Sequence, residues 1–491
     1  MIRVTRRWVL RFLLLLLAGG LAFLARPLHH LFRVAWRDEA AAEPLPPGVL
    51  DDASRMSATR VGELVPVLDQ SDLIAALGRA RADDLPVSLA GGRLSMGAQT
   101  LVADGIVLDM TGYGLVRYRP EQELLVAGAG ATWRAVLEEA DRHGRSPTHA
   151  PGLADATVGG TVSVNAYGWQ VGKPPVGAGV VEMLVMLVDG ALWRCSREQN
   201  AELFAAVLGG YGLFAIIVEV SLATQANRAC RRDSELVPVS ALADLLRRWA
   251  ADEAVEMAAA SISVLPGKPF DRAVATIVRS VEGRPPALQR IDGTWLQRMA
   301  RRGAIDDDYG KWVNWQVQSM VRPVLAQSRL SRNSTFNRPV GNLLLPGGPT
   351  ANLVLTLFVP PDELAAWLNQ AGLILAGYET ELLDIEVSYL GADNDSLLRY
   401  ASRDLCAVRL LLNESRRPSG EYRLRELSMA LIQRALALGG GFFLPHRRHA
   451  SAVQFKAAYG NTARFIRMKR RFDPQERLQN AFYREYLQPL V

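Results

Sequence analysis

The chain has 491 residues, of which 49% are hydrophobic and 22% are charged, enough to bury a large core that we expect to divide into two domains. Its formal net charge is +6, but residues 1–37 hold seven arginines and no acidic residue, so the remainder is close to neutral. No basic stripe interleaved with aromatic residues runs through the body of the chain, which argues against nucleic acid as a partner. Cys195, Cys230 and Cys406 lie far apart without a CxxC pair, so neither a disulfide scaffold nor a metal site is expected.

The N-terminus has the composition of a targeting segment. Four arginines precede an apolar run of 14 residues, Phe12–Ala25, which is shorter than the roughly 20 residues of a membrane-spanning helix. The run fits the apolar part of a signal peptide, and with Trp8–Leu10 included it is long enough for a tilted anchor. Thr5–Arg11 also resembles a twin-arginine export signal. We therefore expect residues 1–37 to be a signal or a transmembrane anchor, and the protein to be exported or membrane-anchored, on the periplasmic side if bacterial.

Residues 38–60 are polar and contain three prolines, so we interpret them as a linker. Between residues 61 and 228, short apolar runs alternate with helical patterns and predict one α+β domain. Ser71 and Asp72 are expected to begin a helix that ends near Ala82, and Thr132 a helix that Gly144 ends. Strands are expected at residues 64–67, 86–90, 106–109, 115–118, 124–127, 181–188, 191–195 and 214–220, and a short helix at 202–208.

The pattern changes in residues 229–440. Helices are expected at 242–256 and 426–438, and strands at 352–359 and 383–390. This alternation predicts an antiparallel sheet with helices on one face. Residues 280–350 are rich in arginine and aromatic side chains and are expected to form loops over a ligand.

Four glycine-rich clusters, at residues 91–97, 128–130, 157–161 and 209–212, indicate that the backbone approaches a ligand closely. None of them is a dinucleotide fingerprint. Gly128 and Gly130 are followed by Trp133, which would block close packing of helix on strand, and the cluster at 209–212 follows a helix instead of preceding one. A P-loop motif is also absent from the sequence.

Taken together, the clusters resemble the flavoproteins of the vanillyl-alcohol oxidase and p-cresol methylhydroxylase family. Val87–Gly97 is similar to the family's pyrophosphate turn, Thr157–Gly168 to the segment that lines the flavin, and Asn200–Gly212 to the corresponding run of cytokinin dehydrogenases. The resemblance implies a two-subdomain FAD-binding domain at 61–228, a central α+β substrate (cap) domain at 229–440, and a C-terminal segment, 441–491, that returns to the FAD domain.

The resemblance also implies an FAD cofactor and its binding residues. These are Gly91, Gly92, Arg93, Leu94, Ser95, Pro151, Gly152, Thr157, Val158, Gly160, Ser163, Gly168, Gly212, Ile216 and Val218. Many members attach the flavin covalently through a histidine directly before the serine of the first loop. Leu94 holds that position here, and no cysteine lies between Tyr167 and Val176 for a second attachment, so a non-covalent FAD is expected.

Three residues are candidates for the catalytic base. His446 falls where similar enzymes place a Lys or His facing the flavin, and Tyr167 and His149 are weaker candidates; for each, a purely structural role is the alternative. Some cytokinin dehydrogenases carry a catalytic Asp three residues before the position of Asp155, and the offset puts a role for Asp155 in doubt.

The function that we expect is FAD-dependent oxidation of an alcohol carbon in a small-molecule substrate that is sugar-like or lipid-linked. Two alternatives stay open: reduction of a carbon–carbon double bond, as in sterol reductases with a similar flavin domain, and a binding protein that keeps the fold without catalysis. The sequence leaves the electron acceptor undetermined.

Overall fold

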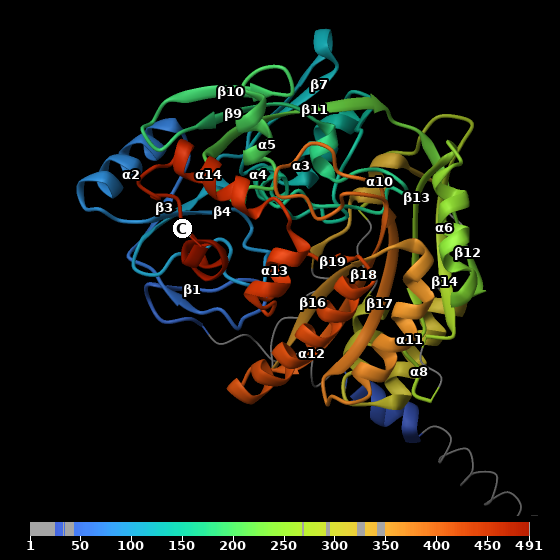
Figure 1. The fold of residues 1–491 in the computed structure, drawn as a ribbon. Coiled ribbons are helices and arrows are strands. Elements are labelled where there is room, and N and C mark those ends of the chain that lie inside the picture. The colour runs from blue at the N-terminus through green and yellow to red at the C-terminus, as the bar shows by residue number, and fades with distance from the viewer. Residues whose placement is uncertain are drawn as a thin grey trace, which may run out of the picture.

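The computed structural model describes residues 25–32, 34, 44–267, 270–290, 295–321, 329–340 and 349–490. It is a mixed α+β fold, as expected, in which several sheets carry helices on their outer faces. The blue-to-green first half of the chain forms one body, and the yellow-green to orange strands form most of a large antiparallel sheet. The red C-terminal segment packs against the first half (Figure 1).

The first sheet is parallel. Its order is β3 (Glu63–Pro66), β5 (Ile106–Asp109), β4 (Val87–Ala90). Helix α2 (Gln70–Ala82) follows β3. Its N-cap is Asp69 and not Ser71 or Asp72, because the Asp69 carboxylate accepts from both of those amides while Asp72 completes a capping box.

The second sheet is antiparallel and has the order β10-β9-β11-β7-β6, with β8 pairing on β11. Its strands are β6 (Val116–Arg119), β7 (Leu124–Gly128), β8 (Arg145–Pro147), β9 (Val180–Met186), β10 (Leu192–Ser196) and β11 (Ile216–Ala226). The helices beside it are α3 (Trp133–Arg142), α4 (Val158–Ser163) and α5 (Ala201–Val207). The predicted hairpin is confirmed: β9 and β10 pair directly, and Gly190 takes the positive φ of +90° that the turn requires.

A third sheet contains eight strands among the described residues. In spatial order they are β15 (Arg329–Ser331), β12 (Ala229–Pro238), β14 (Arg272–Val281), β13 (Val255–Ile262), β17 (Glu381–Leu390), β18 (Leu405–Ser415), β16 (Thr350–Val359) and β19 (Gly441–Phe442), all antiparallel. Helix α6 (Leu242–Ala250) packs on β13 and β17, and α12 (Pro418–Ala437) on β16 and β18; α11 (Leu364–Leu375) contacts α12.

Two sequence-based expectations for this region were wrong in detail. The helix expected at 242–256 ends at Ala250, and Val255 already begins β13. Strands β12, β14 and β18 were not predicted, because β12 is mostly polar while β14 and β18 are mostly apolar, and none shows the clear alternation that marks a half-buried strand. Residues 295–321 form helices α7 (Trp295–Gly303) and α8 (Asp308–Gln316), continued by a π-helical turn at Val317–Val321 and followed by α10 (Arg332–Phe336), where loops were expected.

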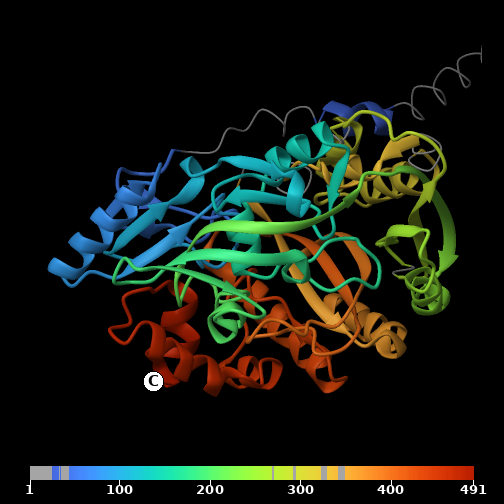
Figure 2. The ribbon, with the colours of Figure 1, turned by 90° about the horizontal axis from the view of Figure 1, so that it is seen from above.

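The chain returns to the first sheet at its C-terminus, through α13 (Ala452–Ala458) and α14 (Thr462–Phe472). The Val87 amide donates to the Arg477 carbonyl at 2.8 Å, and the Gln479 amide donates to the Val87 carbonyl at 2.9 Å. The Asn480 amide group donates to the Tyr211 carbonyl at 2.9 Å. Figure 2 shows the red segment beneath the blue and green elements, so the C-terminal segment and the first two sheets build one body.

No helix within the described residues is long and apolar enough to cross a membrane. The expected signal or anchor falls on residues 1–37, of which the structure describes only 25–32, in a helix, and residue 34. The transmembrane helix therefore stays a prediction from the sequence.

Candidate functional site

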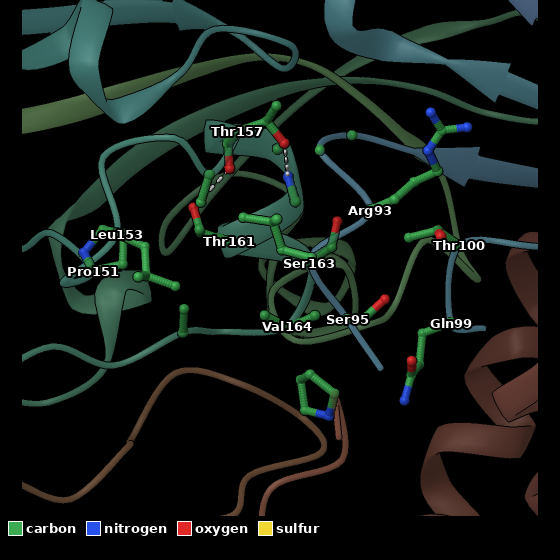
Figure 3. Close-up of a pocket in the computed structure, with 18 of the residues that line it drawn as sticks. Arg93, Ser95, Gln99, Thr100, Pro151, Leu153, Thr157, Thr161, Ser163 and Val164 are labelled. Carbon is green, nitrogen blue, oxygen red and sulfur yellow. Dashed lines mark hydrogen bonds between the residues drawn. The ribbon is translucent and has the colours of Figure 1, made fainter. Parts of the chain in front are cut away.

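One pocket gathers the glycine-rich segments of the first two sheets against the large antiparallel sheet. The first half of the chain lines it with residues 89–96, 99, 100, 110, 129, 151–153, 156, 157, 159–161, 163, 164, 166–169, 211, 212, 216 and 217. The large sheet and the C-terminal segment add Arg338, Val340, Val354, Thr356, Glu386, Arg409, Phe443, Pro445 and His446. Figure 3 shows Thr157, Thr161 and Ser163 on one side of this pocket and Ser95, Gln99 and Thr100 on the other.

The loop after β4 supplies unpaired donors to the pocket. None of the five main-chain amides of residues 91–95 donates to another described residue. The Ser95 hydroxyl is buried and has no partner among the described residues. Successive free amides in a turn, with Arg93 in the left-handed region at φ +50°, form a concavity that binds anions.

Contacts behind the loop hold it in this shape. The Ala53 amide donates to the carbonyls of Arg93 and Ser95, at 3.0 and 3.2 Å. The Met96 amide donates to the Pro445 carbonyl at 2.8 Å, so the C-terminal segment also fixes the loop. The Ala53 bonds occupy two carbonyls of the loop, and the Met96 bond fixes its end, while the amides of residues 91–95 keep no partner among the described residues.

Two glycines are required by close approach. A Cβ on Gly91 would lie 2.2 Å from the Thr157 hydroxyl oxygen, and one on Gly159 would lie 2.8 Å from the Ala129 Cβ. Thr157 caps α4 by accepting from the Gly160 amide at 3.3 Å. The loop after β4 and the start of α4 therefore touch, and together they make one continuous wall of the pocket.

A hydrogen-bonded row of three side chains lies in the same pocket. Thr356 is fully buried on β16, and its hydroxyl accepts from the Tyr167 hydroxyl at 3.1 Å. The same oxygen lies 2.9 Å from Nε2 of His446. Burial, together with the nearby Arg409, lowers the pKa of His446 to about 3, and burial raises the pKa of Tyr167 to about 12. Both side chains are therefore neutral at physiological pH.

The large sheet contributes a polar wall that the sequence analysis did not find. Glu386 on β17 accepts from the Arg409 guanidinium of β18 and from the Trp169 indole, each at 2.7 Å. The Arg338 guanidinium lies 3.6 Å from the Trp169 ring centroid. Glu386 and Arg409 are charged residues within largely apolar strands. This pattern could have indicated them from the sequence, because a charged side chain is rarely buried without a partner.

The structure separates the sequence-predicted residues into two groups. His446 and Tyr167 line the pocket, as do all the expected FAD-binding residues except Val158 and Val218. Those two valines are fully buried in the core and support the wall instead of forming it.

The third candidate base, His149, lies outside the pocket lining. Its Nδ1 is 3.2 Å from the Thr148 hydroxyl, and burial, followed by the charge of Arg332, lowers its pKa to about 4. Asp155 is also engaged elsewhere, since it accepts from Arg134 at 2.5 Å and from the Val340 amide at 2.7 Å.

Comparisons with known proteins agree with this geometry. A family model described as an FAD binding domain matches residues 64–196. Cytokinin dehydrogenase 2 of Arabidopsis thaliana is 34% identical over 129 residues, which are 26% of this chain and 26% of that protein. Cytokinin dehydrogenase 5 of Arabidopsis thaliana is 33% identical over 156 residues, or 30% of this chain and 28% of that protein, and cytokinin dehydrogenase 2 of Oryza sativa subsp. japonica is 33% identical over 161 residues, with the same coverage.

Residues 64–196 form an FAD-binding domain that is similar to those of the vanillyl-alcohol oxidase and p-cresol methylhydroxylase flavoproteins. Its cofactor is FAD. The matched stretches span between about a quarter and a third of the curated relatives. The family match at residues 64–196 includes most of the pocket's glycine-rich wall. The residues present fit the cofactor: five amides and the Ser95 hydroxyl without partners among the described residues suit a pyrophosphate, and Gly159 and Gly160 line the pocket without side chains.

The contact between Gly91 and Thr157 can be tested by substitution. We expect Gly91→Ala to weaken FAD binding about tenfold or more, because the added methyl group displaces the Thr157 hydroxyl and separates the two parts of the pyrophosphate wall. The measurement is a fluorescence titration of flavin-free protein with FAD. Gly78→Ala is the matched control, since a Cβ at that exposed position on α2 meets no atom within 4 Å. Equal affinities for the two variants would contradict the assignment.

Proposed function

We propose that this protein is an FAD-dependent oxidoreductase that removes a hydride from an alcohol carbon of a sugar-like or lipid-linked substrate. The observation that carries the proposal is the neutral His446, held by Thr356 and Tyr167 in the same pocket as the flavin-binding wall. Oxidation of an alcohol requires a hydride acceptor and a base for the hydroxyl proton. Bound FAD supplies the hydride acceptor, and His446 is the base.

Nε2 of His446 and the Thr356 hydroxyl lie within hydrogen-bond distance, and either group can be the donor. The proposed reaction requires that Nε2–H donates. The Thr356 oxygen has two lone pairs, which accept the Tyr167 hydroxyl and an Nε2–H of His446 together. In that tautomer Nδ1 carries the lone pair. Within the described residues, the His446 ring has no second hydrogen-bond partner. Thr356 and Tyr167 thus orient the ring, and the substrate hydroxyl donates to Nδ1.

A histidine with so low a pKa is a weak base, yet it suits this reaction. Burial disfavours the imidazolium, so His446 holds no proton before the substrate arrives. As the hydride leaves, the substrate hydroxyl becomes that of a protonated carbonyl, which is far more acidic than an imidazolium ion. Proton transfer to Nδ1 is therefore favourable at the moment when it is needed.

Two features favour an alcohol over the C–N bond that the names of the plant relatives imply. The position at which some cytokinin dehydrogenases carry a catalytic Asp is Gly152 here. Asp155, the nearest carboxylate along the chain, is paired with Arg134 and lies outside the pocket lining. The pocket's polar wall of Glu386 and Arg409 instead offers both an acceptor and donors to the hydroxyl groups of a sugar.

The reaction is tested by anaerobic bleaching of the flavin with polyols, sugars, lipid-linked sugars and a cytokinin. We expect alcohols of the sugar type to bleach the flavin absorbance without a nucleotide. Bleaching by NAD(P)H with no response to any alcohol would replace the proposal with reduction of a carbon–carbon double bond. Bleaching by the cytokinin alone would place the oxidation at a C–N bond, and purified protein without flavin absorbance would indicate a binding protein.

The role of His446 has its own test. We expect His446→Gln to lower kcat about 10²-fold to 10⁴-fold while the visible flavin spectrum is retained. His149→Gln, at the candidate outside the pocket, is the control and should leave kcat within about twofold. In the unaltered enzyme kcat/KM should show no loss as the pH falls from about 8 to about 5, because a base with a pKa of about 3 remains unprotonated over that range. An acid limb near the ordinary histidine pKa of about 6.5 would rule out His446 as the base.

The attachment of the flavin is tested by acid precipitation. Leu94 occupies the linkage position and has no group that bonds to a flavin, so we propose that FAD is held by shape and hydrogen bonds alone. The yellow chromophore should remain in the supernatant when the protein is precipitated with acid. A yellow pellet that survives washing would show a covalent bond elsewhere in the pocket.

A further inference from the structure

The helix of residues 25–32 is fastened to the turn between α7 and α8. His30 is buried: its Nδ1 lies 3.2 Å from the Asp307 carboxylate, and its ring stands edge-on to Tyr309 with centroids 5.5 Å apart. The Arg26 guanidinium lies 4.8 Å from the centroid of the same Tyr309 ring. Arg26 and His30 are one helical turn apart, and Val34, 3% exposed, lies a further four residues on. These residues form the inward face of the segment.

The opposite face of this helix is apolar and exposed. Leu28 is 61% exposed and Leu31 is 56% exposed, at the spacing of three residues that places them on one side. Phe32, one residue further, is 68% exposed. A soluble surface helix would carry polar side chains here.

Helix α8, which contacts Arg26 and His30 through Tyr309, carries further exposed apolar side chains. Trp312 is 48% exposed and stacks on Tyr309, with ring centroids 5.7 Å apart and an interplanar angle of 24°. Met320, two turns later on the same continuous helix, is 64% exposed. We call Leu28, Leu31, Phe32, Trp312 and Met320 the α8 face. In Figures 1 and 2 the dark-blue helix lies beside the yellow helices at one end of the molecule.

The residues before and within this helix indicate what the α8 face binds. The apolar run Phe12–Ala25 ends where the helix begins, and residues 1–37 carry seven arginines and no acidic residue. An apolar face with a tryptophan at its edge and a basic flank matches the interface of a membrane with anionic head groups. A second protein copy would not account for the one-sided excess of arginine.

We propose that the α8 face docks on an anionic phospholipid bilayer and lays the large antiparallel sheet against the membrane. The helix of residues 25–32 and α8 enter the head-group region together, since Tyr309 contacts both Arg26 and Trp312. The proposal does not depend on the chemistry of the pocket.

Trp312 provides the decisive measurement, because it is far along the chain from the N-terminal apolar run. Trp312→Cys and Leu31→Cys in the full-length protein are labelled with an environment-sensitive fluorophore and added to vesicles of phosphatidylcholine with or without phosphatidylglycerol. The native Cys195, Cys230 and Cys406 do not compete, since they are buried and burial raises the pKa of each to about 12. Ile74→Cys on α2 is the matched control, being 55% exposed like Leu31.

We expect the labels at positions 31 and 312 to shift to the blue and to be quenched by nitroxide-bearing lipid, more strongly when phosphatidylglycerol is present. The label at position 74 should not respond. A label at 312 that stays in water while the one at 31 is quenched would overturn the proposal, because the N-terminal segment alone would then bind. Failure of all labels to respond would also overturn it. A shift at 312 that follows protein concentration without vesicles would assign the face to self-association.

Discussion

The structure depends on keeping the five amides of residues 91–95, which line the pocket, without a partner among the described residues. Exposed donors of this kind are costly in a folded protein unless a ligand or water satisfies them. The chain maintains them by binding the loop from behind, through Ala53 on one side and Pro445 on the other. The C-terminal segment is needed for this arrangement as much as the glycines are, which explains why the chain returns to its first sheet after building the large one.

The large sheet is attached to the flavin-binding body by buried polar contacts. Arg332, 2% exposed, is bonded to Glu256 of β13 at 2.7 Å and to the Pro147 and Thr148 carbonyls beside β8 at 2.6 and 3.1 Å. A buried guanidinium with its donors satisfied specifies one relative placement of the bodies it joins, because any shift leaves a desolvated charge without its partners. The row Tyr167, Thr356 and His446 relies on that placement, since its members come from the segment after α4, from β16 and from the C-terminal segment.

The pocket has two walls of different composition. One is made of backbone and small residues and meets a cofactor whose shape is constant. The other consists of charged and aromatic side chains: Glu386 on β17 and Arg409 on β18, with Trp169 and Arg338. The FAD-binding family model matches residues 64–196, which include most of the first wall and none of the large sheet.

The sequence by itself determined the features that rest on local geometry. The glycine clusters, the cap at Thr132, the hairpin at Gly190 and the leucine at position 94 each follow from a residue's own backbone freedom or chemistry. Only the tertiary structure decided which of two histidines faces the pocket, that Val158 and Val218 support the wall, and that Glu386 meets Arg409. Those choices depend on the packing of segments far apart along the chain, and neither residue type nor periodicity encodes that packing.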